Sequence, residues 1–535
     1  MKVRPTIKDI SLPSEQMAEL DAKELMPLPA PYDNHEAWGD IKELKETQRQ
    51  RLEASLDGVT ALQLPRPQTK AEEDELVRKF LAGVGRLLSS DDNWTFLGPL
   101  RLRLEYCAKC QTCAEACPVF LASGRQEIYR PNYRSEILRR IIRKYFTPGG
   151  KVLAGFNGSD IEVTWPLVAR LGELAYRCTV CRRCAKVCPL GVGNAMVTRE
   201  IRKVFSQEMG IAPAPLHRLG SMKQLQTGSS TGMSPAAFAD TVEFMEEEVE
   251  EKTGMRLKFP IDKEGADILL IHNAGEFLAW PENPEAFAVI FEKAGLNYTL
   301  SSELLGYDGV NYGVWYDDAQ FARVAIKHFE VAKKLGVKKI VVGECGHAHK
   351  AITVIADRLL PSNMKVPVES CYTLLDQLVA SGKFQLDPSR NNFPVTLHDP
   401  CNIVRLMGIV EPQRRILRKI APQFREMNPH GTENYCCGGG SGFAIMQDLN
   451  FPDWRNAISG RMKFKQALEA FQGEDPAQRK YICAPCSNCK GQLRGVLEYY
   501  DATNKVGMRY IGMVELIVNA MADIEKPYLA EEEGF

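Results

Sequence analysis

Two short cysteine runs constrain the fold of this chain more than any other feature. "CAKCQTCAEACP" and "CTVCRRCAKVCP" both follow the pattern C-x2-C-x2-C-x3-C-P. In this pattern three closely spaced thiolates hold one face of a [4Fe–4S] cube, and the fourth cysteine binds the cube of the other run. The spacing therefore predicts two cubane clusters, one held by Cys107, Cys110, Cys113 and Cys188 and the other by Cys178, Cys181, Cys184 and Cys117.

Structural zinc is the alternative for these runs, since zinc also binds paired C-x2-C units. Two complete runs, each followed by a proline, favour iron–sulfur clusters over zinc. The segments "RSEILRRIIRKYF" and "GNAMVTREIRKVF" flank the runs with the periodicity of amphipathic helices. The sequence therefore predicts a helical two-cluster ferredoxin domain, which carries electrons one at a time and offers no open coordination site.

Length, charge and hydropathy exclude several classes of protein. A chain of 535 residues predicts more than one domain, and its net charge of −1 gives no sign of a nucleic-acid partner. The N-terminus lacks the apolar core of a signal peptide, so the 16 cysteines are expected in a reducing compartment, where they bind metals or carry out redox chemistry. No apolar run approaches the ~20 residues that span a bilayer, so any membrane role requires a partner subunit.

The remaining cysteines lie in a second region that repeats its own plan. Short β-rich runs there alternate with helical runs, which predicts an α/β region. "LLIHNAG" matches "VTLHDPC", "SSELLG" matches "TENYCCG", and "IVVGECGHA" matches "YICAPCSNC". We therefore expect two tandem halves of similar plan, with the cysteines of the second half gathered at the carboxyl edge of its sheet.

The second half contains the pattern C-x34-CC-x48-C-x2-C, formed by Cys401, Cys436, Cys437, Cys486 and Cys489. A disulfide between adjacent cysteines is strained, so two thiolates directed at one metal centre are the better interpretation of the pair in "ENYCCGGGSG". The glycines that follow are expected to leave room for the metal centre and for an incoming substrate sulfur. The first half keeps only Cys345 at the matching positions and cannot build the same site.

Two cysteines and one histidine near this pattern have more than one interpretation. Cys483 lies three residues before Cys486 and is an alternative ligand to Cys489, although only Cys486 and Cys489 align with the first half. Cys371 has no match in the repeat and is expected in the core. His398, in "HDPC", either orients or protonates a neighbouring ligand or caps the end of a strand.

A polar cluster survives in the first half within "GECGHA", which contains Glu344, Cys345 and His347. If the two halves face each other, this cluster points at the metal site of the second half. It then supplies either an extra ligand or a proton donor, and the alternative is an inert remnant.

The cysteine pattern of the second half resembles the cysteine-rich CCG domain of heterodisulfide reductases. The whole plan resembles the catalytic D subunit of methanogen heterodisulfide reductase and, more closely, the K subunits of DsrMKJOP membrane complexes. The motifs that carry the closer likeness are "YCAKCQTCAEACP", "EIYRPNYRSEILRR", "GECGHA" and "APCSNC".

This resemblance implies a function for the chain and a set of partners. The five second-half cysteines would hold a non-cubane [4Fe–4S] cluster, at which a disulfide or trisulfide substrate is cleaved. A DsrM-like cytochrome b subunit would anchor the chain at the cytoplasmic face of the inner membrane. A small sulfur carrier resembling DsrC would be the substrate, and the chain would act as an oxidoreductase on sulfur groups in dissimilatory sulfur metabolism.

Two other functions are consistent with the sequence. The chain could be the iron–sulfur electron-transfer subunit of a flavin-dependent 2-hydroxyacid or glycerol-3-phosphate dehydrogenase, whose domain order is similar. Alternatively, its C-terminal region could be a non-enzymatic module that binds zinc. No G-x-G-x-x-G follows a strand, so we expect no dinucleotide in this chain.

The expected architecture is a multidomain α plus α/β protein, in which the ferredoxin-type domain precedes two CCG-type halves. The segment "RQEIYRPNYRSEILRRIIRK" is rich in arginine and predicts either a solvated helix face or a docking patch for an acidic partner. The predicted boundaries are 1–98 for an N-terminal helical extension, 99–218 for the ferredoxin-type domain, 219–260 for a linker, 261–385 for the degenerate CCG half, 386–525 for the half with the non-cubane cluster, and 526–535 for an acidic tail.

Overall fold

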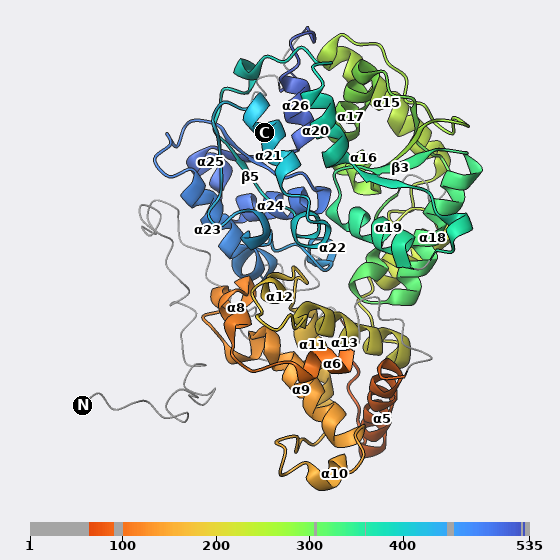
Figure 1. Cartoon of the computed structure of the whole chain (residues 1–535), viewed down its shortest axis with the longest axis vertical. Coiled ribbons are helices and arrows are strands. Elements are labelled where there is room, and N and C mark those ends of the chain that lie inside the picture. The colour runs from red at the N-terminus through yellow and green to blue at the C-terminus, as the bar shows by residue number, and fades with distance from the viewer. Residues whose placement is uncertain are drawn as a thin grey trace.

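The computed structural model describes residues 62, 64–89, 100–303, 308–358, 360–446, 454–525 and 528–529. The described chain is elongated, with helices at one end and two sheets at the other (Figure 1). This arrangement confirms the predicted fold class of a helical region followed by two α/β regions. Most of the predicted N-terminal extension and acidic tail lies outside the described residues.

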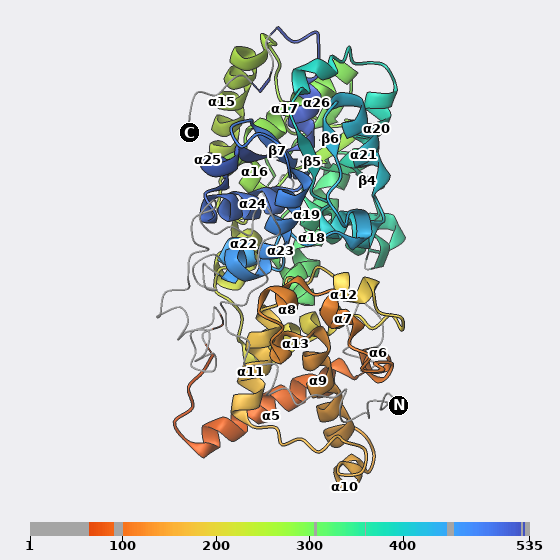
Figure 2. The ribbon, with the colours of Figure 1, turned by 90° about the vertical axis from the view of Figure 1, so that its left-hand side faces the viewer.

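Helix α13 is the centre of the helical end and packs against α5, α9 and α11 (Figure 2). Local sequence fixes where several of these helices begin. The Thr164 hydroxyl accepts a hydrogen bond from the Leu167 N–H at the start of α11. The elements of this end are α5 (Lys70–Leu87), α6 (Leu100–Glu105), α7 (Thr112–Glu115), α8 (Pro118–Ala122), η2 (Glu127–Tyr129), α9 (Pro131–Tyr145), α10 (Gly150–Leu153), α11 (Trp165–Tyr176), α12 (Arg183–Lys186) and α13 (Asn194–Met209).

The first α/β region is built on a parallel sheet with the strand order β2-β1-β3-β4. All four residues of β1 are buried, as expected of a parallel strand covered on both faces. Its elements are β1 (Ile268–Ile271), α16 (Ala274–Ala279), α17 (Glu282–Ala294), β2 (Tyr298–Thr299), η4 (Tyr312–Trp315), α18 (Asp318–Lys334), β3 (Lys339–Val342), α19 (Gly346–Arg358), η5 (Ser362–Met364), β4 (Val368–Ser370) and α20 (Cys371–Ala380).

The second α/β region repeats the same topology with the strand order β6-β5-β7-β8, again all parallel. Strands β5 and β7 therefore correspond to β1 and β3, as the sequence repeat predicts. Its elements are η6 (Pro388–Asn391), β5 (Val395–Leu397), η7 (Ile403–Met407), α21 (Glu411–Ile420), β6 (Phe424–Arg425), η8 (Gly431–Glu433), α22 (Phe443–Met446), η10 (Trp454–Ser459), α23 (Arg461–Ala470), β7 (Lys480–Cys483), α24 (Ser487–Tyr499), α25 (Ala502–Val506), β8 (Met508–Ile511) and α26 (Met513–Asn519).

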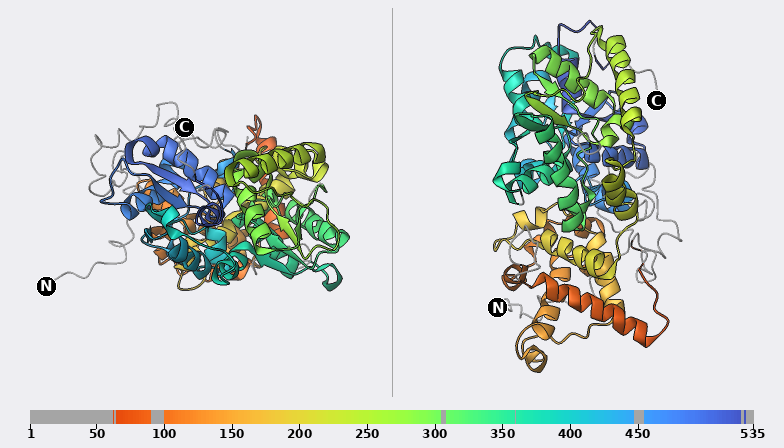
Figure 3. Two further views of the ribbon diagram at one scale, coloured as in Figure 1. Left: turned by 90° about the horizontal axis from the view of Figure 1, so that it is seen from above. Right: turned by 90° about the vertical axis from the view of Figure 1, so that its right-hand side faces the viewer.

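The two α/β regions lie side by side and share one hydrophobic core (Figure 3). Helix α17 packs against α26, and α20 packs against α21. The Tyr372 hydroxyl of the first region donates a hydrogen bond to the Pro485 carbonyl of the second. The two helix contacts are reciprocal, because α17 and α21 are counterparts in the repeat, as are α20 and α26. The segments that follow β3 and β7 also meet, where the Ser487 N–H donates to the Glu344 carbonyl at 2.8 Å, so the carboxyl edges of the two sheets lie together.

Residues 219–260, expected from composition to be a linker, contain regular structure. They include most of η3 (His217–Met222), all of α14 (Lys223–Thr227), and α15 (Pro235–Thr253). Phe238, Val242 and Met245 of α15 are buried in the core that the two α/β regions share. This segment is therefore an integral part of the first α/β region.

The arginine-rich segment of α9 forms neither a solvated face nor an open docking patch. Arg134 and Arg139 are only 4% and 6% exposed, although both are charged. The side chain of Arg139 donates to Glu136 at 2.8 Å, and the Lys144 ammonium pairs with Asp160 at 2.7 Å. Much of the positive charge of this segment is therefore neutralised within the chain.

Candidate metal centres

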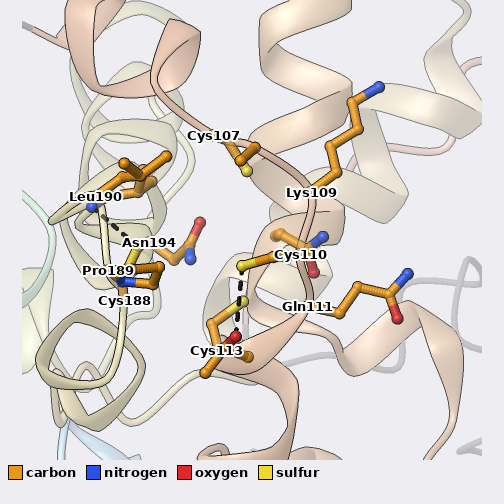
Figure 4. A pocket seen from close by; sticks show the side chains of 13 residues that line it. Cys107, Lys109, Cys110, Gln111, Cys113, Cys188, Pro189, Leu190 and Asn194 are labelled. Carbon is orange, nitrogen blue, oxygen red and sulfur yellow. Dashed lines mark hydrogen bonds between the residues drawn. The ribbon is translucent and has the colours of Figure 1, made fainter.

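Four cysteines of the ferredoxin-type region line one cavity near the surface (Figure 4). Cys107, Cys110 and Cys113 come from the first run, and Cys188 reaches the cavity from the end of the second run. The Cys110 side chain is exposed, and the Cys188 sulfur accepts a hydrogen bond from the Val192 N–H at 3.3 Å. The structure thus brings together the four residues that the spacing assigns to one cluster.

The other four cysteines line a second cavity, deeper in the protein, which contains Cys117, Cys178, Cys181 and Cys184. Burial raises the pKa of the Cys117 thiol to about 12 and that of Cys113, in the first cavity, to about 11. Four thiols around one buried cavity fit a soft metal centre, because bound metal stabilises the thiolate that burial disfavours. The donor sets of both cavities therefore fit iron–sulfur clusters.

The two runs share an unusual backbone conformation at corresponding positions. Lys109 and Gln111 have φ angles of 57° and 64°, and Val180 and Arg182 have φ angles of 53° and 65°. A non-glycine residue in this left-handed region costs roughly 1–2 kcal/mol. Because the same two positions are left-handed in both runs, we attribute the conformation to the turning of three successive thiols toward one cavity.

The five cysteines of the second α/β region come from three places at the carboxyl edge of its sheet. Cys401 follows β5, Cys436 and Cys437 follow η8, and Cys486 and Cys489 lie at the start of α24 just after β7. Four of them are at most 4% exposed, and Cys401 is half-buried. All five lie in or against one hydrophobic cluster, so sequence-distant thiols converge here as predicted for such a sheet.

Neighbouring thiols of this group interact in pairs. Cys436 interacts with the thiols of Cys401 and Cys437, and Cys437 interacts with Cys489. The contacts with Cys436 and Cys489 hold the pKa of Cys437 well below its usual value. A ring nitrogen of His398 and the sulfurs of Cys437 and Cys489 all lie within 4.8 Å of one another, which is close enough to surround a single ion.

Several contacts join this group to the ferredoxin-type region, and one of them is between two thiols. The Cys181 thiol, which lines the second cavity, interacts with the Cys436 thiol, and both residues belong to the same buried cluster. Arg405 reinforces the junction by donating to the Cys181 carbonyl at 3.3 Å and to the Thr432 carbonyl at 3.0 Å. Arg183 also crosses it, donating to the Glu433 carbonyl at 2.8 Å.

The glycines after the cysteine pair serve close packing of the protein itself, contrary to the expected role of leaving room for a cluster and a substrate. A Cβ at Gly438 would lie 2.4 Å from the Gly460 nitrogen, and one at Gly440 would lie 2.6 Å from the Thr179 carbonyl oxygen. Gly438 also has a φ of 97°, which other residues rarely adopt. The glycine loop thereby fits between α23 and the second cysteine run.

A buried lysine lies beside the cysteine pair and has no distinctive sequence signal. The Lys463 ammonium donates to Asn434, to Gln466 and, at 3.3 Å, to the Met427 sulfur. Burial lowers the pKa of Lys463 to about 7, while the nearby Asp399, Cys436 and Cys437 side chains oppose that change. In sequence Lys463 is one of two lysines in "RMKFKQ", an ordinary amphipathic helix pattern, so only its burial identifies it.

Asp399, in "HDPC", is held by a buried arginine. Its carboxylate accepts two hydrogen bonds from the Arg414 guanidinium, both at 2.8 Å, and one from the Gly431 N–H at 2.6 Å. The Asp399 carbonyl accepts a further hydrogen bond from the Asn434 side chain at 2.7 Å. Asp399 therefore fixes the segment that leads to Cys401 against the loop that leads to the cysteine pair.

Glu344 and Cys345, two members of the polar cluster in the first α/β region, lie in different surroundings. The Glu344 carboxylate is buried among hydrogen bonds from the Met513 N–H and the Asn283 side chain, at 3.0 and 2.9 Å, and burial raises its pKa to about 8. Cys345 lies next to Cys486, whose sulfur accepts a hydrogen bond from the Gly346 N–H at 3.4 Å. Glu344 therefore links the two α/β regions, and Cys345 lies beside the five-cysteine group.

Cys371 and Cys483 are fully buried away from the five-cysteine group. Cys483 is the last residue of β7, paired with Leu397 of β5. Both side chains lie in the core shared by the two α/β regions, whereas Cys486 and Cys489 lie in the separate cluster around the cysteine pair. This placement favours Cys489 over Cys483 as a member of the candidate metal site.

A cavity of about 370 Å³ opens between the two α/β regions beside these thiols. Cys345 and His347 of the first region and Ser487 of the second line it. Burial lowers the pKa of His347 to about 3, so its ring is neutral near pH 7. The cavity is therefore a route by which a small group can reach the neighbourhood of Cys486 from outside.

Comparison with known proteins identifies the two cysteine-bearing regions. The family described as a 4Fe-4S dicluster domain matches residues 103–192, and the family described as a cysteine-rich domain, CCG, matches residues 395–494. No solved structure matches the chain. Within the described residues, no helix is both long and apolar enough to cross a membrane.

Three relatives show the range of related proteins. The "Hdr-like menaquinol oxidoreductase iron-sulfur subunit 2" of Archaeoglobus fulgidus is 26% identical over 79% of this chain and 80% of its own length. The "Probable membrane-anchored ferredoxin" of Chromohalobacter salexigens is 23% identical over 76% of this chain and 58% of its own length. The D subunit of the dihydromethanophenazine:CoB--CoM heterodisulfide reductase of Methanosarcina barkeri is 24% identical over 73% of this chain and 88% of its own length.

These relatives confirm the resemblance to the D subunit of heterodisulfide reductase that the cysteine motifs indicate. The 4Fe-4S dicluster match covers the cysteines of the two runs, and the CCG match covers the five cysteines of the second α/β region. The chain is therefore an iron–sulfur oxidoreductase related to the Hdr-like menaquinol oxidoreductase iron–sulfur subunits and to the heterodisulfide reductase D subunits.

Proposed function

We propose that this chain passes electrons between a membrane-bound, quinone-linked cytochrome b subunit and a disulfide or trisulfide substrate. The substrate is a sulfur atom carried by a small protein of the DsrC type, and the chain is attached to the cytoplasmic face of the membrane through its partners. One observation carries the proposal. A series of neighbouring thiols begins at the exposed Cys110 and passes through the second cavity. It then crosses to the five-cysteine group where Cys181 meets Cys436, and it ends at the cavity that Cys345 lines.

The eight cysteines of the two runs would hold two cubane [4Fe–4S] clusters. Cys401, Cys436, Cys437, Cys486 and Cys489 would hold a non-cubane [4Fe–4S] cluster. The clusters, when bound, supply storage of single electrons and an iron site that accepts a substrate sulfur. Cleavage of a disulfide needs two electrons, so the chain must supply them in two successive deliveries.

The side chains around the cysteine pair would control charge and solvent at that site. Lys463, when protonated, places a positive charge beside Cys436 and Cys437, where it offsets the negative charge of the thiolates. His398, fully buried, packs its ring beside Cys437 and excludes water. Cys345 and His347 line the cavity next to Cys486 and would meet the substrate sulfur as it enters.

The first prediction is an iron content of about twelve atoms per chain, from two cubanes and one four-iron non-cubane centre. Iron and acid-labile sulfide analysis of anaerobically purified protein measures this number. About eight iron atoms per chain would mean that the five-cysteine group holds no iron cluster. One zinc ion per chain at that group would instead support a structural module.

The second prediction separates electron delivery from the substrate site. Cys113→Ser removes one thiol of the first cavity, which is remote from the cavity at Cys345. We expect electron transfer from the membrane partner to fall strongly, while binding of the sulfur substrate stays within about twofold of the wild type. Stopped-flow reduction and calorimetric binding measure the two properties. Loss of both in a folded variant would contradict the proposed division.

The identity of the partners tests the proposal as a whole. Isolation of the native complex should recover a haem b subunit and a small sulfur-carrier protein. A tightly bound flavoprotein, with turnover of a hydroxyacid or glycerol phosphate, would instead assign the chain to the flavin-dependent dehydrogenases. Quinone-linked reduction of a disulfide or trisulfide on the carrier protein is the decisive activity.

A further inference from the structure

The cavity between the two α/β regions has a chemically distinct floor and mouth. Helix α24 forms one wall along its length, with Ser487 at the floor and Arg494 at the mouth. These two residues are seven positions apart, which corresponds to about 10 Å along an α-helix. Gly491, between them, has no side chain to fill this wall, and a Cβ there would lie 3.1 Å from the Trp280 ring.

The floor of the cavity contains polar groups beside the metal site. The His347 side chain is only 7% exposed, and its Nδ1 has no hydrogen-bond partner among the described residues. Trp315 holds this ring edge-on, with centroids 4.8 Å apart. The Cys345 thiol lies at the same floor, next to Cys486. An unsatisfied buried ring nitrogen is costly, so the floor is suited to a ligand that pairs with it.

The mouth of the cavity carries a cation without a carboxylate partner in the described part of the chain. The Arg494 guanidinium lies over the Trp280 ring, 5.5 Å from its centroid, and no ion pair joins it to Glu498. Arg455 contributes a second guanidinium to the wall. A guanidinium is the side chain best suited to bind a planar carboxylate through two hydrogen bonds.

We propose that this cavity binds an organic disulfide that carries a carboxylate about 10 Å from the reacting sulfur, with the sulfur end at Cys345 and His347 and the carboxylate at Arg494. This inference rests on the proposed function and names the class of its substrate. The volume of about 370 Å³ lies in the range of about 300–1,000 Å³ typical of small-ligand pockets. An extended peptide covers about 10 Å in three residues, so a peptide tail and a small dicarboxylic disulfide both fit the chemistry.

The test compares matched ligands on the anaerobically purified holoprotein. The disulfide of 6-mercaptohexanoic acid places each carboxylate roughly 8–10 Å from the sulfurs when extended, and its dimethyl ester removes the charge; a short peptide disulfide with a free C-terminus and its C-terminal amide form the second pair. Calorimetry should show that the wild type binds each acid more tightly than its neutral counterpart. Tighter binding of the peptide would identify a protein tail as the source of the carboxylate, and tighter binding of the mercaptohexanoic acid disulfide would identify a small molecule.

The variant Arg494→Gln should weaken binding of both acids by about fivefold or more and leave the neutral ligands unchanged. Arg494→Lys should restore part of the affinity, because it keeps the charge. Arg323→Gln, on the exposed surface of α18, is the matched control and should behave as the wild type. Equal binding of acid and neutral ligands by the wild type, or unchanged binding in Arg494→Gln, would overturn the inference.

Turnover with reduced viologen separates this inference from the proposed function. If both hold, Arg494→Gln raises KM for the acids and leaves kcat unchanged. If the wild type reduces acid and ester equally well, the carboxylate assignment fails and the proposed function stands. If the wild type binds the acids selectively but reduces no disulfide, the proposed function fails and the binding assignment stands.

Discussion

Cys437→Ser is expected to abolish disulfide chemistry while leaving electron flow through the two runs intact. The Cys437 thiol contacts both Cys436 and Cys489 and also lies beside His398, so it is central to the five-cysteine group. A serine oxygen is a poor substitute for a thiolate at an iron centre. Iron should fall from about twelve to about eight atoms per chain, and turnover by more than about a hundredfold, since even outer-shell changes at metal sites cost 10–100-fold.

Electron paramagnetic resonance distinguishes the centres in this variant. The unusual paramagnetic signal expected when the oxidised five-cysteine site binds a thiol should disappear, and both ferredoxin-type signals should remain, because their eight ligands are unchanged. Cys483→Ala is the matched control. It removes a buried thiol three residues before Cys486 that lies in a different core cluster, and it should keep full iron and activity. Normal turnover and iron in Cys437→Ser would refute the metal site.

Asp318→Asn is expected to cause the largest loss of stability among the changes considered. Asp318 is fully buried at the start of α18, where it pairs with Lys203 at 3.0 Å and with Arg199. Both cations belong to α13, so this carboxylate joins the helical region to the first α/β region. Removal of one partner leaves buried charges uncompensated, which typically costs about 3–5 kcal/mol. The midpoint of thermal unfolding should fall by several degrees.

The pH dependence of this effect follows from the direction of the pKa shift. Burial acts to raise the pKa of Asp318, but the Arg199 and Lys203 charges outweigh it and hold the pKa below the ordinary 3.8. The stabilisation is therefore present above pH 3.8 and is lost only as the pH falls further. Asp160→Asn, which breaks an exposed pair with Lys144, should leave the midpoint of thermal unfolding nearly unchanged, because solvent screens exposed ion pairs. Similar midpoints for the two variants would contradict the assigned role of Asp318.

Local spacing in the sequence was sufficient to predict the thiol cavities. The two runs place their first three cysteines close together along the chain, and the structure shows that each run's fourth cysteine lines the cavity of the other run. The strand order of the two sheets likewise follows the repeat. These features are predictable because ligand spacing and strand periodicity are properties of short segments.

Segments misjudged from composition show where local reasoning fails. The stretch expected to be a linker contains α15, because its apolar residues are buried in the shared core and the helix packs against α17 of the first α/β region. Arg134 and Arg139 are buried although they lie in a strongly charged segment. The glycines after Cys437 let neighbouring backbone approach closely, and they do not leave space for a ligand. Each outcome depends on what packs against the segment, which composition does not contain.

The sequence by itself determined which residues could bind iron, that helices precede two α/β regions, and that only the second region carries a full set of thiols. Only the tertiary structure decided that Cys181 meets Cys436, that Lys463 is buried beside the cysteine pair, and that a cavity with Arg494 at its mouth ends at Cys345. The physical reason is that metal-ligand patterns depend on the spacing of residues close together in the sequence. Burial, charge pairing and cavities instead arise where distant segments pack together.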